Sequence, residues 1–237
     1  MAGRFSILCF AASALVASTA PAVAENLLVD RNNDGAVEIL AFGDSITYGV
    51  GDQYAPGDYV EQIYDAGDPG GYPLRLSSIL GVSVENAGVP GEELITAGIF
   101  RFIDLMQSSS ADTVIFKEGV NDSVHLVDAQ TYSITVQTAI NVARAQGKTI
   151  VVSTLAPPTQ MHASLEPYTA AYSSSIRELV ILNSVPLVDL DVMFRTACPI
   201  LSTCSYYNLP EGLHPNSLGY DAIASTMANA FTGGSNQ

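Results

Sequence analysis

The sequence predicts an α/β fold in which helices cover both faces of a mostly parallel sheet of five strands. Five short apolar runs recur along the chain, and amphipathic helical segments separate them. Strands buried on both faces have such continuous apolar runs, and strands that alternate with helices favour parallel pairing. The chain has 237 residues, 48% of them hydrophobic, which is enough for one large domain with a sizeable core.

Each predicted element rests on a local pattern of apolar residues. The strands are apolar or β-branched runs closed by turns, and we expect them at 37–42, 82–84, 113–116, 149–153 and 186–190. The helices have apolar residues at 3.6-residue spacing or short helical stretches bounded by Pro and Gly, and we expect them at 73–80, 95–106, 132–143, 168–180 and 216–231. Residues 49–71 form a long polar loop rich in tyrosine and acidic residues, which we interpret either as a substrate-contacting loop or as a solvated one.

Residues 1–24 have the pattern of a secretory signal peptide. Arg4 supplies a positive start, residues 7–16 form an apolar core, and Ala22-Val23-Ala24 gives small residues at the spacing for cleavage before Glu25. The apolar core is too short to span a bilayer, and the alternative is a frayed N-terminal helix. The prediction is therefore a single domain over 25–237, secreted to the periplasm or the medium, without a transmembrane segment.

The net charge limits the possible partners, and the cysteines indicate a disulfide. Without residues 1–24, the chain keeps 8 of its 9 basic residues and all 24 acidic ones, a formal charge of about −16. Such a surface repels nucleic acid and anionic membranes. Cys198 and Cys204 are predicted to form a disulfide, since an even pair in a secreted chain is typical of one, with two free thiols as the alternative.

No metal or cofactor is expected from the spacing of candidate ligands. Residues 30–35 match the opening of a calcium loop, but its twelfth position would be Ala41, where a bidentate Glu is required. We interpret this segment as a polar turn before the first strand. No further cysteine or histidine lies at ligand spacing from Cys198 and Cys204.

Polar motifs follow the ends of the first three predicted strands, and a fourth motif follows the last predicted strand. Ser45 comes after the first strand, Gly91 after the second and Asn121 after the third, while His214 lies in the loop beyond the fifth. In an open α/β sheet, segments at the carboxyl ends of strands converge on one crevice. We expect these residues to lie together.

Each of these residues has a role in ester hydrolysis. Ser45 is the predicted nucleophile, His214 its general base, and Glu211 the acid that orients the imidazole. The backbone N–H groups of Ser45 and Gly91 and the side-chain amide of Asn121 are the predicted donors to the tetrahedral oxyanion.

Four motif blocks together resemble the SGNH, or GDSL, hydrolase family of bacterial secreted esterases and lipases. They occur in order over nearly the whole mature chain as Gly43-Asp44-Ser45, Gly91 within Asn86-x-Gly88-x-x-Gly91, Gly119-x-Asn121-Asp122 and His214-Pro215-Asn216. The resemblance implies a three-layer αβα, flavodoxin-like fold, a Ser-His-Asp triad and the three-donor oxyanion hole. A Gly-x-Ser-x-Gly elbow is absent from the nucleophile motif, which disfavours the α/β-hydrolase family.

One position departs from the family pattern. The family has Asp three residues before the histidine, where this chain has Glu211. A Ser-His dyad assisted by a backbone carbonyl is the alternative to a Ser-His-Glu triad. Asp44 and Asp122 are interpreted as residues that orient the Ser45 and Asn121 loops.

The substrate is expected to be a small-molecule or glycan ester with a short acyl chain. Gly70-Gly71-Tyr72 resembles a segment of the family's carbohydrate acetylesterases. The alternatives are a lipase or lysophospholipase of the same family, and a catalytically silent module that binds glycans or calcium. The sequence leaves the oligomeric state open, and it leaves His125 and His162 as either pocket-lining or surface residues.

Overall fold

Five parallel strands form the central sheet of the computed structural model, which describes residues 26–63 and 70–233. The predicted signal peptide and part of the polar loop at 49–71 lie outside the described residues. The strands are β1 (Glu38–Gly43), β3 (Ser83–Gly88), β4 (Thr113–Lys117), β5 (Thr149–Ser153) and β6 (Leu187–Val188), in the order β3-β1-β4-β5-β6. Every neighbouring pair in this sheet is parallel.

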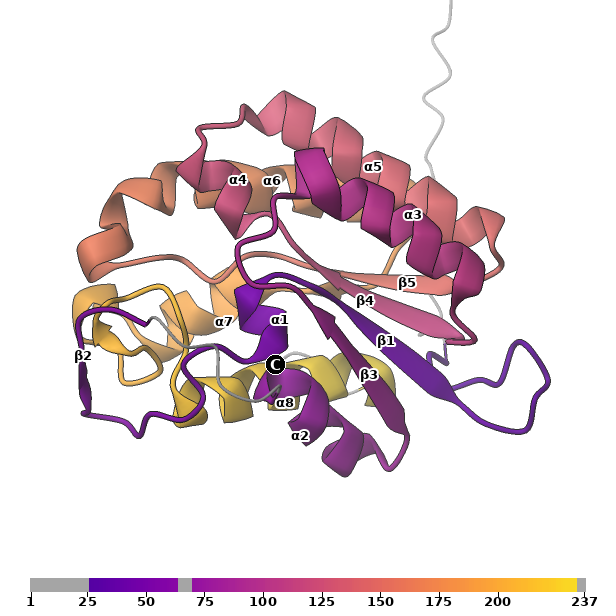
Figure 1. The fold of residues 1–237 in the computed structure, drawn as a ribbon, viewed down its shortest axis with the longest axis horizontal. Coiled ribbons are helices and arrows are strands. Elements are labelled where there is room, and N and C mark those ends of the chain that lie inside the picture. The colour runs from indigo at the N-terminus through magenta and orange to yellow at the C-terminus, as the bar shows by residue number, and fades with distance from the viewer. Residues whose placement is uncertain (1–25, 64–69, 234–237) are drawn as a thin grey trace, which may run out of the picture.

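Helices cover both faces of the sheet, which confirms the predicted three-layer fold (Figure 1). One face carries α3 (Ile99–Ser108), α5 (Ala129–Ala145) and α6 (Glu166–Asn183), and the other carries α2 (Gly71–Leu80), α7 (Leu190–Ala197) and α8 (Ser217–Thr232). Side chains alternate between these layers along each strand. In β4, for example, Val114 and Phe116 pack into the apolar core beneath α3, α5 and α6, whereas Ile115 packs into the core beneath α2, α7 and α8.

The strand order brings three chain segments to the same edge of the sheet. The chain runs from β1 outward to β3 and then returns to the other side of β1 to form β4. The direction of winding therefore reverses at β1, and such a switch point opens a crevice at the carboxyl ends of the strands. The segments that follow β3, β1 and β4 border this crevice.

The last predicted strand is wrong in length. The sequence predicts a strand over 186–190, but β6 ends at Val188 and α7 begins at Leu190. Asp189 caps this helix, because its side chain accepts a hydrogen bond from the Val192 N–H. The cap carries the chain into a helix where apolar content alone favoured a longer strand.

Short elements outside the main sheet were not predicted. Two strands, β2 (Tyr59–Val60) and β7 (Leu209–Pro210), pair in parallel as a second sheet. The helix expected at 95–106 begins with a π-helical turn, Leu94–Gly98, because the Asp122 carboxylate accepts hydrogen bonds from the Leu94 and Ile95 N–H groups at 2.9 and 3.0 Å. The remaining short helices are α1 (Ser45–Tyr48), α4 (Val120–Val124) and the 3₁₀ turns Gln160–Leu165 and Leu201–Thr203.

Residues 30–35, which match the opening of a calcium loop, form a polar turn before β1. The Asp30 carboxylate accepts hydrogen bonds from backbone N–H groups of this turn, including that of Gly35 at 2.9 Å. The buried Asp112 side chain also accepts from the Arg31 and Asn32 N–H groups, at 2.6 and 3.2 Å, and fixes the turn beside β4. Over 26–63 and 70–233, no three His, Cys, Asp or Glu side chains form a group that could hold a metal ion.

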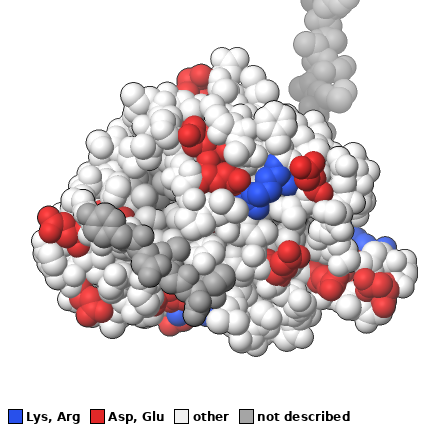
Figure 2. Space-filling model, viewed as in Figure 1, with Lys and Arg blue, Asp and Glu red and all other residues white. Residues whose placement is uncertain are grey.

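Cys198 and Cys204 form a disulfide that joins the end of α7 to the segment leading toward His214, with Cα atoms 5.2 Å apart. None of the described helices is long and apolar enough to cross a membrane. Acidic side chains are spread over the face shown in Figure 2, and basic ones are few there.

Candidate active site

Ser45 lies at the first turn of α1, directly after β1. Asp44 caps the helix, because its Oδ1 accepts a hydrogen bond from the Ile46 N–H at 2.8 Å. Gly43 makes the turn possible, since a Cβ atom there would lie 2.1 Å from both the Lys117 oxygen and the Thr47 hydroxyl. The Ser45 N–H belongs to the first turn of a helix, where backbone N–H groups have no intrahelical acceptor.

A chain of hydrogen bonds joins Ser45, His214 and Glu211. The Ser45 Oγ lies 2.9 Å from Nε2 of His214, and Nδ1 of His214 lies 2.8 Å from Oε1 of Glu211. The carboxylate therefore occupies the position that a backbone carbonyl would take in a Ser-His dyad. The extra methylene of Glu, relative to Asp, does not prevent contact with the imidazole.

The Glu211 carboxylate is buried but well supplied with donors. Its Oε2 accepts hydrogen bonds from the Leu213 and His214 N–H groups, both at 2.9 Å. Nε2 of His162 lies 3.3 Å from its Oε1. Burial raises the pKa of Glu211, but the contacts with His162 and His214 outweigh it and hold that pKa well below its ordinary value. Glu211 is thus an anion at neutral pH.

Asn208 fixes the loop that carries His214. Its side-chain amide donates to the backbone oxygens of His214, Pro215 and Gly51 at 3.2, 3.0 and 3.2 Å. Gly51 lies in the loop after α1, and a Cβ atom there would lie 2.3 Å from the Asn208 amide nitrogen. Asn208 therefore ties the histidine loop to the loop after the serine. The sequence analysis missed this residue, since a single Asn in a loop has no distinguishing pattern.

Gly91 lies in the turn after β3 and Asn121 on the short helix α4 after β4, and these two strands flank β1, which leads to Ser45. The turn after β3 is attached to the end of β1 by a hydrogen bond from the Val89 N–H to the Gly43 oxygen at 2.9 Å. Gly91 has a φ of +78°, a conformation that favours glycine. The Asn121 side-chain amide donates to the backbone oxygen of Glu92, the residue after Gly91, at 2.7 Å.

Arg101 supports the Gly91 loop, and the sequence analysis did not find it. Its guanidinium pairs with the Glu92 carboxylate, with Nε 2.8 Å from Oε1, and donates to the Ala87 oxygen at 2.8 Å. It also lies 4.2 Å from the centre of the Phe42 ring. One side chain from α3 thus holds the turn after β3 against the end of β1.

Three ionisable groups lie buried beneath the serine turn. Lys117 and Asp44 form a fully buried ion pair with Nζ–oxygen distances of 3.2 and 3.3 Å. The neighbouring Glu118 is also buried, and Oε2 of this side chain has no hydrogen-bond partner among the described residues. Burial, with the nearby Asp44 charge, raises the pKa of Glu118 well above its ordinary value. Glu118 therefore favours the neutral form.

The remaining residues singled out in the sequence lie nearby. Asp122 is buried, and its carboxylate accepts hydrogen bonds from the turn that begins at Leu94. Burial raises the pKa of Asp122, although those backbone hydrogen bonds lower it. His125 is exposed, and its Nδ1 lies 3.3 Å from Oε1 of Glu93. His162, in contrast, touches Glu211.

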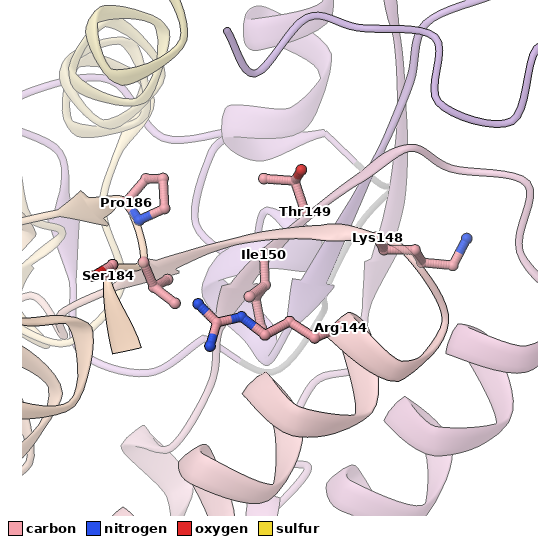
Figure 3. A pocket seen from close by; sticks show the side chains of 7 residues that line it. Arg144, Lys148, Thr149, Ile150, Ser184 and Pro186 are labelled. Carbon is pink, nitrogen blue, oxygen red and sulfur yellow. The ribbon is translucent and has the colours of Figure 1, made fainter. Parts of the chain in front are cut away.

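A separate cavity lies at the opposite edge of the sheet, where β5 begins and the chain enters β6 (Figure 3). Its lining includes Arg144, Lys148 and Ser184. Both cations are bonded to backbone oxygens, Arg144 to that of Asn183 and Lys148 to those of Ser109 and Ala111, the latter two at 2.7 Å. Burial lowers the pKa of Lys148. Ser45, His214, Glu211, Gly91 and Asn121 do not line this cavity.

Comparison with known proteins identifies the family. The model of the GDSL-like Lipase/Acylhydrolase family matches residues 41–222. Comparison with curated proteins found no match.

Several solved structures have the same fold. A lipase/acylhydrolase from Enterococcus faecalis matches with a TM-score of 0.64 and 19% identity, over 83% of this chain and 96% of that one. An acetyl xylan esterase, AlAXEase, matches with a TM-score of 0.66 and 22% identity, over 82% of this chain and 99% of that one. The acetylxylan esterase Axe2 from Geobacillus stearothermophilus matches with a TM-score of 0.64 and 18% identity, over 83% and 94%.

At these identities the structural likeness shows the fold alone, whereas the family match extends over most of the chain. The chain therefore belongs to the GDSL-like lipase/acylhydrolase family and is a carboxylic ester hydrolase.

Proposed function

We propose that this protein is a serine esterase that works through an acyl-enzyme on Ser45. The observation that supports it best is the continuous chain from the Ser45 hydroxyl through His214 to Glu211, with contacts of 2.9 and 2.8 Å. His214 accepts the hydroxyl proton as the oxygen attacks the ester carbonyl, and then gives it to the leaving alcohol. Water enters next, and the same histidine activates it to release the acid.

Glu211 has two roles in this mechanism. Its Oε1 fixes the tautomer of His214, because Nδ1 must carry the proton to donate to the carboxylate while Nε2 accepts from Ser45. Its negative charge stabilises the imidazolium that forms when the serine is deprotonated. The low pKa of Glu211 supports both roles, since the carboxylate remains ionised through the cycle.

The oxyanion is proposed to be bound by three donors, one from each of the segments that follow β1, β3 and β4. These are the backbone N–H groups of Ser45 and Gly91 and the side-chain amide of Asn121. The Asn121 amide has two N–H groups, and only one is needed for its bond to Glu92. The second remains available for the substrate oxygen, and each such donor typically contributes about 10²–10³ in rate.

We further propose a short acyl chain, with acetyl esters of carbohydrates as the first class to test. Two of the structural matches are named as acetylxylan esterases, which supports this direction. Tyr72 is not a sugar contact, because it is fully buried with its hydroxyl 3.2 Å from the Thr47 hydroxyl. Tyr59, by contrast, is 75% exposed and offers an aromatic face to solvent.

The test is hydrolysis of p-nitrophenyl esters from acetate to palmitate, followed by acetylated xylan. We expect kcat/KM to fall steeply beyond butyrate and acetate to be released from the polysaccharide. A maximum at long acyl chains would instead assign the enzyme to the lipases or lysophospholipases of the family.

The protein is also proposed to be secreted as residues 25–237. The signal-like pattern of residues 1–24 and the Cys198–Cys204 disulfide support this proposal. Expression of the full chain in a bacterial host, with N-terminal sequencing of the exported protein, should give a mature chain that begins at Glu25. Retention of an uncleaved chain in the cytoplasm would contradict it.

A further inference from the structure

The carboxylate of Glu211 faces two imidazoles rather than one. Nδ1 of His214 lies 2.8 Å from Oε1, and Nε2 of His162 lies 3.3 Å from the same oxygen. The other oxygen, Oε2, accepts from two backbone N–H groups. A carboxylate oxygen has two acceptor sites, so with both imidazoles as donors Oε1 is fully occupied.

Backbone hydrogen bonds connect the turn that carries His162 to the loop that carries Glu211. His162 lies on the 3₁₀ turn Gln160–Leu165, and its N–H donates to the Thr159 oxygen at 2.9 Å. The Thr159 N–H in turn donates to the Gly212 oxygen at 2.8 Å, which joins this turn to the loop that carries Glu211. Gly212 allows the approach, since a Cβ atom there would lie 2.4 Å from the Thr159 oxygen.

A glutamate at this position needs such support more than an aspartate does. Its additional side-chain torsion leaves the carboxylate more freedom to rotate away from the imidazole, and each fixed torsion lowers the entropy of the side chain. The backbone N–H groups of Leu213 and His214 hold Oε2, but they leave Oε1 free to move about that anchor. Among the described residues, His162 and His214 are the two whose side chains contact Oε1.

We propose that His162 is a positioning residue that holds Oε1 of Glu211 in line with His214, and so makes a glutamate effective as the orienting acid. This inference rests on the proposed triad. In this role, Nε2 of His162 carries a proton and donates it to Oε1 of Glu211. The 3.3 Å contact is long for a hydrogen bond, and catalytic hydrogen bonds often shorten when substrate binds.

The experiment compares two substitutions at one position. His162→Leu removes the donor and keeps an apolar side chain, whereas His162→Gln keeps an amide N–H near the place of Nε2. We expect kcat on p-nitrophenyl acetate to fall about tenfold in His162→Leu, with KM changed by less than about twofold, because hydrogen bonds to charged groups contribute about that factor. His162→Gln should recover most of the lost kcat. The melting temperatures of both variants check that each is folded.

A double-mutant cycle with Glu211→Gln separates this inference from the proposed triad. If His162 acts through Glu211, His162→Leu should have no further effect on kcat in the Glu211→Gln background. An equal loss in both backgrounds, or full kcat in His162→Leu alone, would overturn the positioning role. Full activity of Glu211→Gln by itself would instead overturn the proposed triad, and this result is distinguishable from a failure of the His162 inference alone.

Discussion

The side-chain amide of Asn121 donates a hydrogen bond to the backbone oxygen of Glu92 at 2.7 Å, which joins α4, after β4, to the turn after β3. This bond sets the direction of the second amide N–H. Because Glu92 follows Gly91, it also fixes the spacing between the two donors proposed for the oxyanion. In the proposed oxyanion hole, this one contact therefore fixes both donors before substrate binds, and the Arg101–Glu92 ion pair supports the Glu92 side of it.

Replacing Asn121 with alanine should lower kcat about 10²–10³-fold and leave KM nearly unchanged. The donor acts on the charge that develops in the transition state, so its loss reduces transition-state binding more than substrate binding. Steady-state kinetics on p-nitrophenyl acetate measures the effect. Asn141→Ala, at an exposed position on α5, is the matched control and should retain full activity. A similar rate in both variants would remove Asn121 from the oxyanion hole.

Replacing Glu211 with glutamine should reduce kcat by a factor on the order of 10³ or more. The two backbone N–H groups that face Oε2 favour an oxygen there, which would turn the amide NH₂ of the new side chain toward Nδ1 of His214. That arrangement favours the wrong imidazole tautomer for accepting the Ser45 proton.

Glu211→Asp keeps the charge and should stay within about tenfold of the natural enzyme, since the family has Asp at this position. Glu178→Gln, on the exposed face of α6, controls for the loss of one negative charge. Equal activity of Glu211→Gln and Glu178→Gln would show that the orienting acid lies elsewhere.

Glu118 should make the protein less stable as pH rises above the ordinary range of a carboxyl group. Burial holds its pKa well above the value it has in the unfolded chain. Between those two pKa values the folded state keeps a proton that the unfolded state has lost, so the free energy of unfolding falls by about 1.4 kcal/mol per pH unit.

Glu118→Gln replaces the titrating carboxyl group with a neutral amide of nearly the same shape. At pH 4 the variant and the natural chain should have nearly the same free energy of unfolding. Toward pH 8 the free energy of unfolding of the variant should increasingly exceed that of the natural chain. Urea unfolding at several pH values measures it. A difference between the two proteins that is independent of pH would contradict the raised pKa.

Many features of the fold were predictable from the sequence because they depend on local patterns. The apolar runs of β1, β4 and β5 and the helical periodicity of α3, α5 and α8 gave the layers, and these are confirmed. The tiny sheet of β2 and β7 was missed, because two-residue strands are too short to have a pattern. The strand at 186–190 was too long, because the Asp189 cap competes with apolar content and starts a helix.

The candidate site divides in the same way. Ser45, Gly91, Asn121 and His214 lie in motifs after predicted strands, and the carboxyl ends of parallel strands converge, so the sequence predicts that these residues lie together. The supporting residues have no such signal. His162 and Asn208 contact segments that are distant in sequence, and Arg101 reaches from α3 to the ends of β1 and β3. Only the packed structure brings these groups together.

Removing the disulfide should destabilise the protein by about 2–2.5 kcal/mol, the loop-closure entropy of so short a ring. The two cysteines are six residues apart in sequence. Unfolding by urea, compared between the natural chain and Cys198→Ser/Cys204→Ser, measures the loss. Activity should fall only modestly, because Asn208 still fixes the His214 loop. Thiol labelling under denaturing conditions that detects two free cysteines before reduction would show that the bond does not form.

The most direct test of the account is covalent labelling of Ser45. The protein should be treated with a fluorophosphonate, which traps activated serine hydroxyls, and its mass should then be measured whole and after digestion. We expect a single adduct on Ser45, no adduct in Ser45→Ala, and much slower labelling in His214→Ala, with esterase activity lost in both variants. Full hydrolysis of p-nitrophenyl acetate by folded Ser45→Ala, or an adduct on another serine, would contradict the proposed nucleophile.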